Sequence, residues 1–252
     1  MSNIVFILGA GANILFGDKG YRGLVIKNEA NTGRFEGNRL IAGSGAMVAD
    51  LIELSLNKGL SGLEHFTGIP STIGGAIWQN LHFLSPDRTK TLFIADIIDS
   101  VEIMDEQGKV FSVDKDFFKF SYDYSILHDR SLLVTEATFQ LQPQEKSIIQ
   151  NQIVENMKWR NEKQPQLFEY ASCGSVFKKI KDIGAGRLID LAGLKGYTIG
   201  GAQISHKHAN YILNTGIATA KDVISLIGVV QNKVKIETGH TLEPEITFIG
   251  EF

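Results

Sequence analysis

Residues 68–76 read Gly68-Ile69-Pro70-Ser71-Thr72-Ile73-Gly74-Gly75-Ala76, and they say more about the fold than any other nine residues. Pro70 presets a turn, and Gly74-Gly75 leave two adjacent backbone positions without side chains. Backbone of this kind lets amide groups approach a flat or charged ligand closely. Thr72 precedes the glycine pair, and Asn80 follows it at short range. The stretch predicts a loop that contacts a ligand; an elaborate structural loop is the alternative.

The bulk composition is that of an ordinary globular protein. Its 252 residues suit one large domain or two modest ones, and 43% hydrophobic with 21% charged residues is enough to build a core. The net charge of -3 disfavours nucleic acid as the main partner. The lone Cys173 excludes an internal disulfide and fits a reducing cytosol. No apolar run approaches the roughly 20 residues of a membrane span, and the first residues lack a signal-peptide pattern, so we expect a cytoplasmic protein.

The residue pattern predicts a mixture of strands and helices. Runs of β-branched and aromatic residues predict strands at 3–8, 23–27, 40–42, 97–104, 110–113, 132–141 and 241–250, with an extended segment at 200–214. Apolar spacing predicts helices at 47–58, 147–162, 184–192 and 219–237. Gly59 and Gly239 are placed to end helices, and Thr219 with Asp222 is typical of a capping box.

The order of these elements predicts an α+β protein with two lobes. Gln107-Gly108, between two predicted strands, indicates a hairpin. Pro143 follows the last strand of the first half, so we place the domain boundary there. The predicted domains are residues 1–142 and residues 143–252.

A second glycine-rich stretch follows the first predicted strand. It reads Gly9-Ala10-Gly11-Ala12-Asn13-Ile14-Leu15. A strand that leads into such a turn points successive amide groups at a phosphate. The Rossmann fingerprint needs a third glycine where Ile14 stands, so that pattern fails. A tight turn after a strand is the alternative.

A serine on a glycine turn is the first candidate for chemistry. Ser175 follows Gly174 within Ser172–Lys179, and nearby lysines could hold an anion. The chain has no Gly-x-Ser-x-Gly elbow, which disfavours acyl-transfer hydrolysis. A structural turn serine is the alternative, and Cys173 is better explained as a small packed side chain than as a nucleophile.

Two further groups of polar residues lie near the C-terminus. On a strand, Glu243 and Glu245 would share one face, and a carboxylate there could act as an acid or polarise a substrate. Pro244 predicts an edge or irregular strand, and a solvated face is the alternative. His206 and His208 would also share one face of a strand, but no third ligand has suitable spacing, so we expect no metal site.

Taken together, these motifs resemble the flavin-dependent UDP-N-acetylenolpyruvoylglucosamine reductases, the MurB family. Seven motifs of that family occur in order along nearly the whole chain. They are Gly9–Leu15, Gly68–Ala76 (apart from Ser71 and Ile73), Lys163-Gln164-Pro165, Gly174–Lys178, Ala185–Gly196, Lys207–Asn210 and Leu242–Glu245.

The resemblance implies a vanillyl-alcohol-oxidase-type FAD-binding domain, short at its N-terminus, and a smaller α+β substrate domain. In the family, NADPH reduces FAD, and the flavin then reduces the enolpyruvyl group of the UDP-sugar to give UDP-N-acetylmuramate for peptidoglycan. The resemblance makes Ser175 the proton donor and Glu245 the assisting carboxylate. It implies FAD contacts at Gly9, Ala10, Gly11, Ala12, Asn13, Ile14, Leu15, Gly68, Ile69, Pro70, Ser71, Thr72, Gly74, Gly75, Ala76 and Asn80. It implies substrate contacts at Tyr122, Lys178, Gln203 and Asn210, and we expect a monomer.

The chain departs from the family pattern in three places. The family's Tyr-Arg-x-Ser reads Tyr122-Asp123-Tyr124-Ser125, so Asp123 stands where a catalytic arginine is expected. The segment after Asn80 reads Leu81-His82-Phe83-Leu84-Ser85 in place of the family's glycine-rich one. Only eight residues precede Gly9, which indicates a truncated form or a reduced flavin subdomain. Lost strands would expose apolar surface.

These departures leave two alternatives to the reductase reading. One is a flavin- or nucleotide-binding relative without catalysis, acting as a scaffold or regulatory module. The other is a flavin enzyme with a different substrate.

Overall fold

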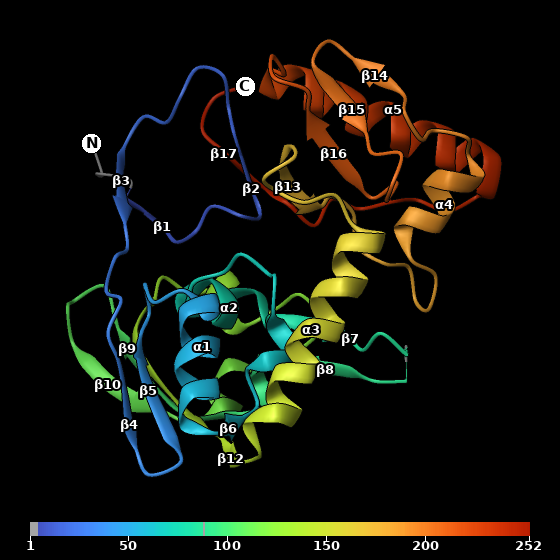
Figure 1. Cartoon of the computed structure of the whole chain (residues 1–252). Helices are drawn as coiled ribbons and strands as arrows, with labels where there is room; N and C mark the ends of the chain where they lie inside the picture. Colours follow the sequence, from blue (N-terminus) through green and yellow to red (C-terminus); the bar gives the residue numbers. More distant parts are fainter. Residues whose placement is uncertain (1–4, 88) are drawn as a thin grey trace. The chain divides into compact units, whose positions relative to one another are not determined.

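The computed structural model describes residues 5–87 and 89–252, which form two compact units (Figure 1). The larger unit contains residues 7–10 and 26–159, and the smaller unit contains the described residues up to 6, residues 11–25 and residues 160–252. Residues 3 and 4 of the first predicted strand lie outside the described residues. The division at residue 142 stays a prediction. Within the described chain, no helix has both the length and the apolar character needed to cross a membrane.

A five-stranded antiparallel sheet is the centre of the larger unit. Its strand order is β10-β9-β11-β5-β4. The strands are β4 (Gly33–Glu36), β5 (Arg39–Gly43), β9 (Ile98–Met104), β10 (Val110–Val113) and β11 (Leu133–Gln140). Strands predicted at 40–42, 97–104, 110–113 and 132–141 are confirmed. The predicted hairpin is confirmed too, because Gly108 has a φ of 77° and the Asp105 N–H donates to the Lys109 carbonyl at 3.0 Å.

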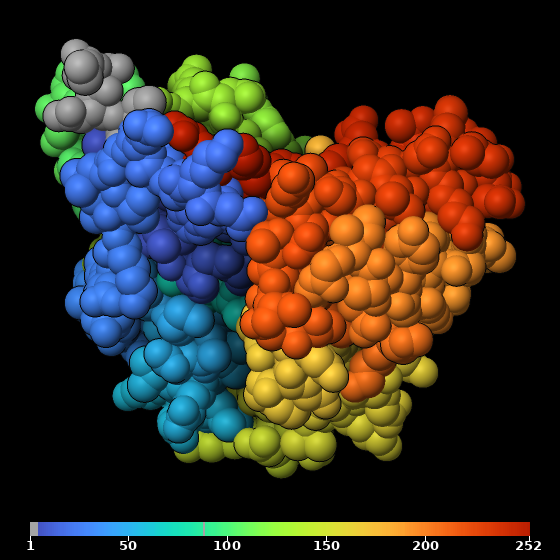
Figure 2. All heavy atoms as spheres, turned by 90° about the horizontal axis from the view of Figure 1, so that it is seen from above, coloured from blue at the N-terminus to red at the C-terminus, as the bar shows by residue number. Residues whose placement is uncertain are grey.

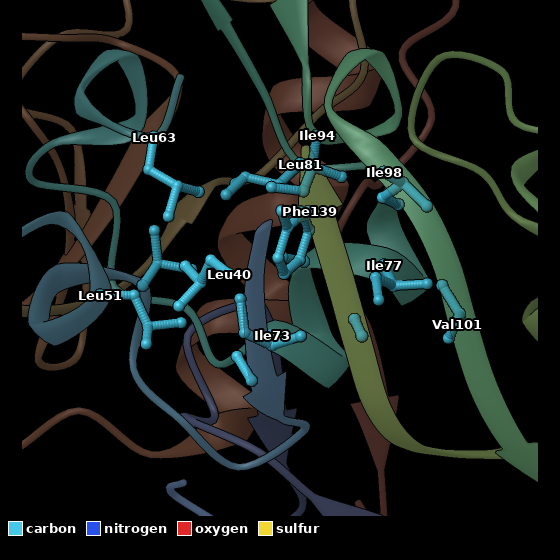
Figure 3. Close-up of a cluster of buried hydrophobic side chains, with 14 of the residues drawn as sticks. Leu40, Leu51, Leu63, Ile73, Ile77, Leu81, Ile94, Ile98, Val101 and Phe139 are labelled. Carbon is cyan, nitrogen blue, oxygen red and sulfur yellow. The ribbon is translucent and has the colours of Figure 1, made fainter. Parts of the chain in front are cut away.

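Helices cover one face of this sheet and form the core with it. They are α1 (Val48–Lys58), α2 (Ile73–Gln79) and α3 (Lys146–Lys163), whose last turn belongs to the smaller unit. Gly59 ends α1 as predicted, in the left-handed region at φ 68°. Leu51 of α1 and Ile73 of α2 pack with Phe139 of β11 in one buried cluster (Figure 3). Apolar burial on this scale supplies most of the stability of the unit.

The start of α2 differs from the sequence prediction. Gly74 and Gly75 were predicted to lie in a loop, but they form the first turn of α2. Thr72 caps this helix, because its side chain accepts the Gly75 N–H at 3.3 Å. The prediction was wrong at this point because a cap and a tertiary partner for the Gly74 N–H outweigh the low helix propensity of glycine.

Short strand pairs and 3-10 turns complete the chain outside the two main sheets. The pairs are β1 (Val5–Leu8) with β3 (Leu24–Lys27), β6 (Leu60–Ser61) with β12 (Gln142–Pro143), and β7 (His82–Leu84) with β8 (Thr91–Phe93). The 3-10 turns are η1 (Glu64–Phe66), η2 (Ile94–Asp96), η3 (Lys115–Phe118) and η4 (Ile126–His128). Leu24 and Val5 are 54% and 48% exposed, and the early residues, coloured blue, are open to view in Figure 2. Apolar surface is therefore exposed at this strand pair.

The smaller unit is a four-stranded antiparallel sheet packed against two helices. The strand order is β13-β16-β15-β14. The elements are β13 (Ala171–Ser175), α4 (Ala185–Leu191), β14 (Thr198–Ile199), β15 (Ala202–Ile204), β16 (Tyr211–Asn214) and α5 (Ala220–Thr238). The capping box of α5 is confirmed: Thr219 and Asp222 bond each other's backbone N–H groups, at 3.1 and 3.0 Å. Gly239 ends the helix at φ 73°.

Two predicted strands of the smaller unit are wrong in extent. The segment 200–214 is two strands separated by a turn, in which the Ser205 hydroxyl accepts the N–H groups of Lys207 and His208. His206 and His208 therefore lie in this turn and not on one face of a strand. The last strand is only β17 (Thr247–Ile249), which pairs in parallel with β2 (Ile14–Phe16). Pro244 has no N–H to donate, so the residues before β17 form only an isolated bridge with Phe177.

Candidate functional site

In the larger unit, the turn after β1 meets the beginning of α2. A Cβ atom added at Gly9 would lie 2.6 Å from the Thr72 hydroxyl oxygen. That oxygen is the cap of α2. The Gly74 N–H donates to the Ser44 carbonyl at 2.7 Å, which holds the same helix start against a third segment. A side chain at position 9 would thus displace the cap.

The third segment is a glycine turn that the sequence analysis missed. Gly43-Ser44-Gly45 lies between β5 and α1, and a Cβ atom at Gly45 would lie 2.5 Å from the Ala30 nitrogen. The Asn28 amide donates to the Ser44 hydroxyl at 2.7 Å, and its backbone N–H donates to the Leu8 carbonyl at 2.8 Å. A Gly-x-Gly directly between a predicted strand and a predicted helix was the signal that could have revealed this turn.

The remaining residues predicted to bind the cofactor are divided between the units. Gly68, at φ 79°, and the residues up to Ala76 belong to the larger unit with Gly9 and Ala10. Gly11 to Leu15 belong to the smaller unit, where the Asn13 amide donates to the Glu245 carbonyl at 3.3 Å. The structure therefore brings together only part of the predicted set within either unit.

Two buried amide oxygens lie at the C-terminal end of α2. Asn80 is 3% exposed, and its amide nitrogen donates to the Ser121 carbonyl at 2.9 Å. Its Oδ1 atom and the Oε1 atom of Gln79 have no hydrogen-bond partner among the described residues. Buried acceptors without a donor cost free energy, so they fit a site whose ligand supplies N–H or O–H groups.

In the smaller unit, Ser175 lies opposite a buried tyrosine. Ser175 ends β13, and its Cα partner on the neighbouring strand is Tyr211, the first residue of β16. Burial raises the pKa of Tyr211, and a smaller opposing effect comes from the Ser175 side chain. Gly174 has a φ of 73° and lies within the irregular register between Ser172 and Ser175. That irregularity shifts the register, so that Ser175 pairs with Tyr211.

The structure brings Glu245 to the same tyrosine. Its backbone N–H donates to the Val176 carbonyl at 2.8 Å, directly after Ser175. Burial is the main cause that raises the pKa of Tyr211, and the negative charge of Glu245 adds to it. The backbone bond to Val176 thus holds the segment of Glu245 beside that of Ser175.

Arg160, like Tyr211, is a residue that the sequence analysis missed. Its side chain is half-buried, and its Nε atom is buried without a hydrogen-bond partner among the described residues. Burial lowers the pKa of Arg160, and Tyr211 raises it. Arginine stays cationic in proteins, so this half-buried side chain places a positive charge within electrostatic range of Tyr211. Its helical position gave no signal in the sequence.

The predicted substrate residues of the smaller unit hold different positions. Asn210 is 6% exposed, and its amide donates to the Phe177 carbonyl at 2.9 Å while accepting the Phe177 N–H at 3.0 Å. Gln203 donates to the Thr198 hydroxyl at 3.2 Å, and Lys178 lies 3.8 Å from the Glu243 carboxylate. Asn210 therefore holds the backbone next to Ser175.

Two departures from the family pattern contact each other in the larger unit. Asp123 is 5% exposed, with a φ of 54°, and its carboxylate lies 3.6 Å from the His82 Nδ1 atom. The ring of Tyr122, a predicted substrate residue, lies 4.6 Å from the His82 ring between centroids. Both departures were visible in the sequence, but their contact was not, because His82 and Asp123 are about forty positions apart.

Cys173 is a packed residue of the smaller unit. Its thiol donates to the Ile14 carbonyl at 3.0 Å, and burial raises the pKa of Cys173 to about 11. Only a small thiolate fraction exists at neutral pH, so this cysteine is a poor nucleophile. Among residues 5–87 and 89–252, no group of three or more His, Cys, Asp and Glu side chains is arranged to hold a metal ion.

Comparison with known proteins identifies two regions of the chain. Residues 164–249 match the family model described as UDP-N-acetylenolpyruvoylglucosamine reductase, C-terminal domain, and residues 3–114 match an FAD binding domain. A reductase of this name from Caldanaerobacter subterraneus is 40% identical over 98% of this chain and 79% of its own length. The chain belongs to the UDP-N-acetylenolpyruvoylglucosamine reductase family. A second such reductase, from Lachnoclostridium phytofermentans, is 38% identical over the same shares.

A solved reductase of the family has the same fold. The crystal structure of UDP-N-acetylenolpyruvylglucosamine reductase from Thermus caldophilus matches with a TM-score of 0.83 and 31% identity, over 99% of this chain and 86% of that one. The predicted α+β fold with an FAD-binding domain is confirmed. The predicted family is confirmed as well.

Proposed function

We propose that this chain reduces the enolpyruvyl group of UDP-N-acetylenolpyruvoylglucosamine to the lactyl ether of UDP-N-acetylmuramate, with FAD as cofactor and NADPH as reductant. The observation that carries the proposal is the backbone pairing that brings Ser175 opposite the buried Tyr211 and bonds Glu245 to Val176, within the region that matches the family's C-terminal domain. A hydroxyl that can donate a proton and a carboxylate close to it are the groups that a protonation step needs. The reaction serves peptidoglycan precursor synthesis, and we place it in the cytoplasm and in a monomer.

The residues of the larger unit fit a flavin nucleotide. Gly9 and Gly45 approach backbone and hydroxyl groups too closely for a Cβ atom, so their segments present bare amide groups. The buried oxygens of Asn80 and Gln79 accept hydrogen bonds that a flavin ring's N–H groups can donate. When bound, FAD supplies the electron transfer between NADPH and the substrate.

Ser175 and Glu245 would act on the second carbon of the substrate's double bond. Reduction of C=C needs two electrons and two protons. One proton arrives with both electrons as a hydride, and the other would pass from the Ser175 hydroxyl to carbon. Glu245 would assist this proton transfer. Asn210 would hold Phe177, while Lys178, Gln203 and Tyr122 would contact the UDP-sugar.

Arg160 would supply the positive charge that Asp123 does not. The developing enolate of the substrate is an anion, and its stabilisation needs a preorganised cation or donor. Arg160 has a buried donor atom with no partner among the described residues, in the same unit as Ser175. Asp123, in contrast, lies beside His82.

Replacement of Arg160 by glutamine tests this role. The substrate-dependent step should slow by about 10²–10³-fold, which is the effect of removing one such donor. Reduction of FAD by NADPH should keep its rate, and stopped-flow absorbance separates the two steps. Arg187→Gln, at an exposed position of the same unit, is the matched control. Equal rates in both variants would remove Arg160 from the mechanism.

Replacement of Gly9 by alanine tests the cofactor site. The new Cβ atom would meet the Thr72 oxygen at 2.6 Å, so the α2 cap must move. We expect FAD to bind at least about tenfold more weakly, and the apoprotein to lose about 1 kcal/mol of stability, the usual value of an N-cap. Titration of FAD fluorescence and thermal melting measure the two effects. Gly184→Ala is the control, because a Cβ atom there meets nothing within 4 Å.

One set of measurements tests the function as a whole. The protein with added FAD should show a flavin absorbance spectrum and oxidise NADPH only when the enolpyruvyl UDP-sugar is present. A protein that stays colourless after FAD is added contradicts the proposal. Flavin binding without substrate-dependent oxidation would instead support a non-catalytic relative or one with another substrate, and the contact between Asp123 and His82 would then be the first place to look. Light scattering in solution tests whether the protein is a monomer.

A further inference from the structure

We propose that Tyr211 is a positioning residue for Ser175: its phenol aims the serine hydroxyl and donates a hydrogen bond to the serine oxygen as the proton leaves. This inference rests on the proposed function, since Ser175 must be the proton donor. Tyr211 is not among the residues that the sequence motifs single out, and it acts on the substrate only through Ser175.

Backbone pairing places the two side chains together. Ser175 and Tyr211 are Cα partners on antiparallel strands, and the adjacent Val176 N–H donates to the Asn210 carbonyl at 2.9 Å. Side chains of directly opposed residues lie on the same face of a sheet, about 5 Å apart at Cβ. The ladder therefore fixes which residue can reach the serine hydroxyl.

The surroundings of Tyr211 leave its ring little freedom. The side chain is 8% exposed, and the His208 ring packs edge-on against it with centroids 5.1 Å apart. The His208 Nδ1 atom accepts the Asn210 N–H at 3.2 Å, so the histidine ring is itself held. A buried phenol needs a polar partner, and the polar residue directly opposite Tyr211 on the neighbouring strand is Ser175.

The charges around Tyr211 favour a neutral phenol. Burial is the main cause that raises its pKa, and Glu245 adds to it, while Arg160 and the Ser175 hydrogen bond lower it. Burial lowers the pKa of the neighbouring His208, which keeps that ring neutral. A phenol that keeps its proton can donate a hydrogen bond throughout the reaction.

The proton transfer balances with Tyr211 unchanged. The O–H bond of Ser175 breaks as a C–H bond forms on the substrate, which leaves negative charge on the serine oxygen. The Tyr211 O–H donates to that oxygen, and Arg160 stabilises the charge from a distance. Water then returns a proton to Ser175. A charge-assisted hydrogen bond of this kind is stronger than a neutral one, so it helps most while the proton is leaving.

Replacement of Tyr211 by phenylalanine removes only the phenolic oxygen. The substrate-dependent step should slow by about 10–10²-fold, because one hydrogen bond to a developing charge is lost. The KM for the UDP-sugar and the rate of FAD reduction by NADPH should not change. The double variant Ser175→Ala/Tyr211→Phe should be no slower than Ser175→Ala alone, since the tyrosine acts through the serine. Tyr197→Phe, 46% exposed in the same unit, is the control.

A second measurement needs neither cofactor nor turnover. The ¹³Cζ chemical shift of Tyr211 is sensitive to hydrogen bonding of the phenol, and Ser175→Ala should change that shift because the phenol loses the side chain opposite it. The inference fails if Ser175→Ala leaves the ¹³Cζ shift unchanged. It also fails if Tyr211→Phe keeps wild-type rates while Ser175→Ala is inactive, a result that leaves the proposed function intact. A wild-type protein that does not reduce the UDP-sugar contradicts the proposed function itself.

Discussion

Replacement of Ser175 by alanine should slow reduction of the enolpyruvyl substrate by about 10²–10⁴-fold, the usual contribution of a general acid. The Cβ atom stays, so the β13–β16 pairing and the Tyr211 packing are preserved, and only the donor oxygen is lost. NADPH should still reduce FAD at the wild-type rate. Single-turnover oxidation of the reduced flavin by the UDP-sugar measures the step directly.

The control for this change is Ser172→Ala. Ser172 lies on the same strand, three residues earlier, and its hydroxyl accepts a long hydrogen bond of 3.5 Å from the Gly174 N–H. The Ser172→Ala variant should turn over at a rate within a few-fold of the wild-type rate. If Ser175→Ala behaves like Ser172→Ala, another group donates the proton, and the assignment of Ser175 is wrong.

Replacement of Phe139 by alanine should lower the free energy of unfolding by about 3–5 kcal/mol, the cost of removing a buried aromatic side chain. Phe139 is 0% exposed on the central strand of the larger sheet, opposite Leu40 and Ile98 (Figure 3). The buried cluster around it includes residues of β5, β9, α1 and α2, so they cannot all move into the space. Because the free energy of unfolding of a domain is about 5–15 kcal/mol in total, the loss should be large enough to see in urea unfolding followed by circular dichroism.

Phe168→Ala is the matched control. Phe168 is 84% exposed, so the same chemical change should alter unfolding by less than about 0.5 kcal/mol. Phe139→Leu should fall between the two. Equal urea-unfolding midpoints for Phe139→Ala and Phe168→Ala would mean that the buried cluster around Phe139 does not stabilise the fold.

Local signals predicted most of the regular elements correctly. The Thr219–Asp222 capping box and the left-handed Gly59 and Gly239 are decided by neighbours within four residues, and the structure confirms all of them. The final strand failed because the backbone of Glu243 to Glu245 bonds with Val176 and Lys178, about seventy residues earlier. No local pattern contains that partner.

The candidate site divides in the same way. Ser175 and Glu245 were found because they lie in short motifs, each readable along the chain. Tyr211 and Arg160 were missed, since their importance depends on contacts with Ser175 and with each other across two strands and a helix end. The contact between Asp123 and His82 was missed for the same reason.

The sequence by itself determined the family, the fold class, the reaction that the family performs and most helix ends, because these depend on motifs and on residues close together in the chain. The stretch from Gly68 to Ala76 belongs to this group. Only the tertiary structure decided that its glycine pair begins a helix, with Gly74 bonded to Ser44, and that a buried tyrosine lies opposite Ser175. Long-range hydrogen bonds and burial act between residues that lie far apart in the sequence, and they become visible only when the chain is folded.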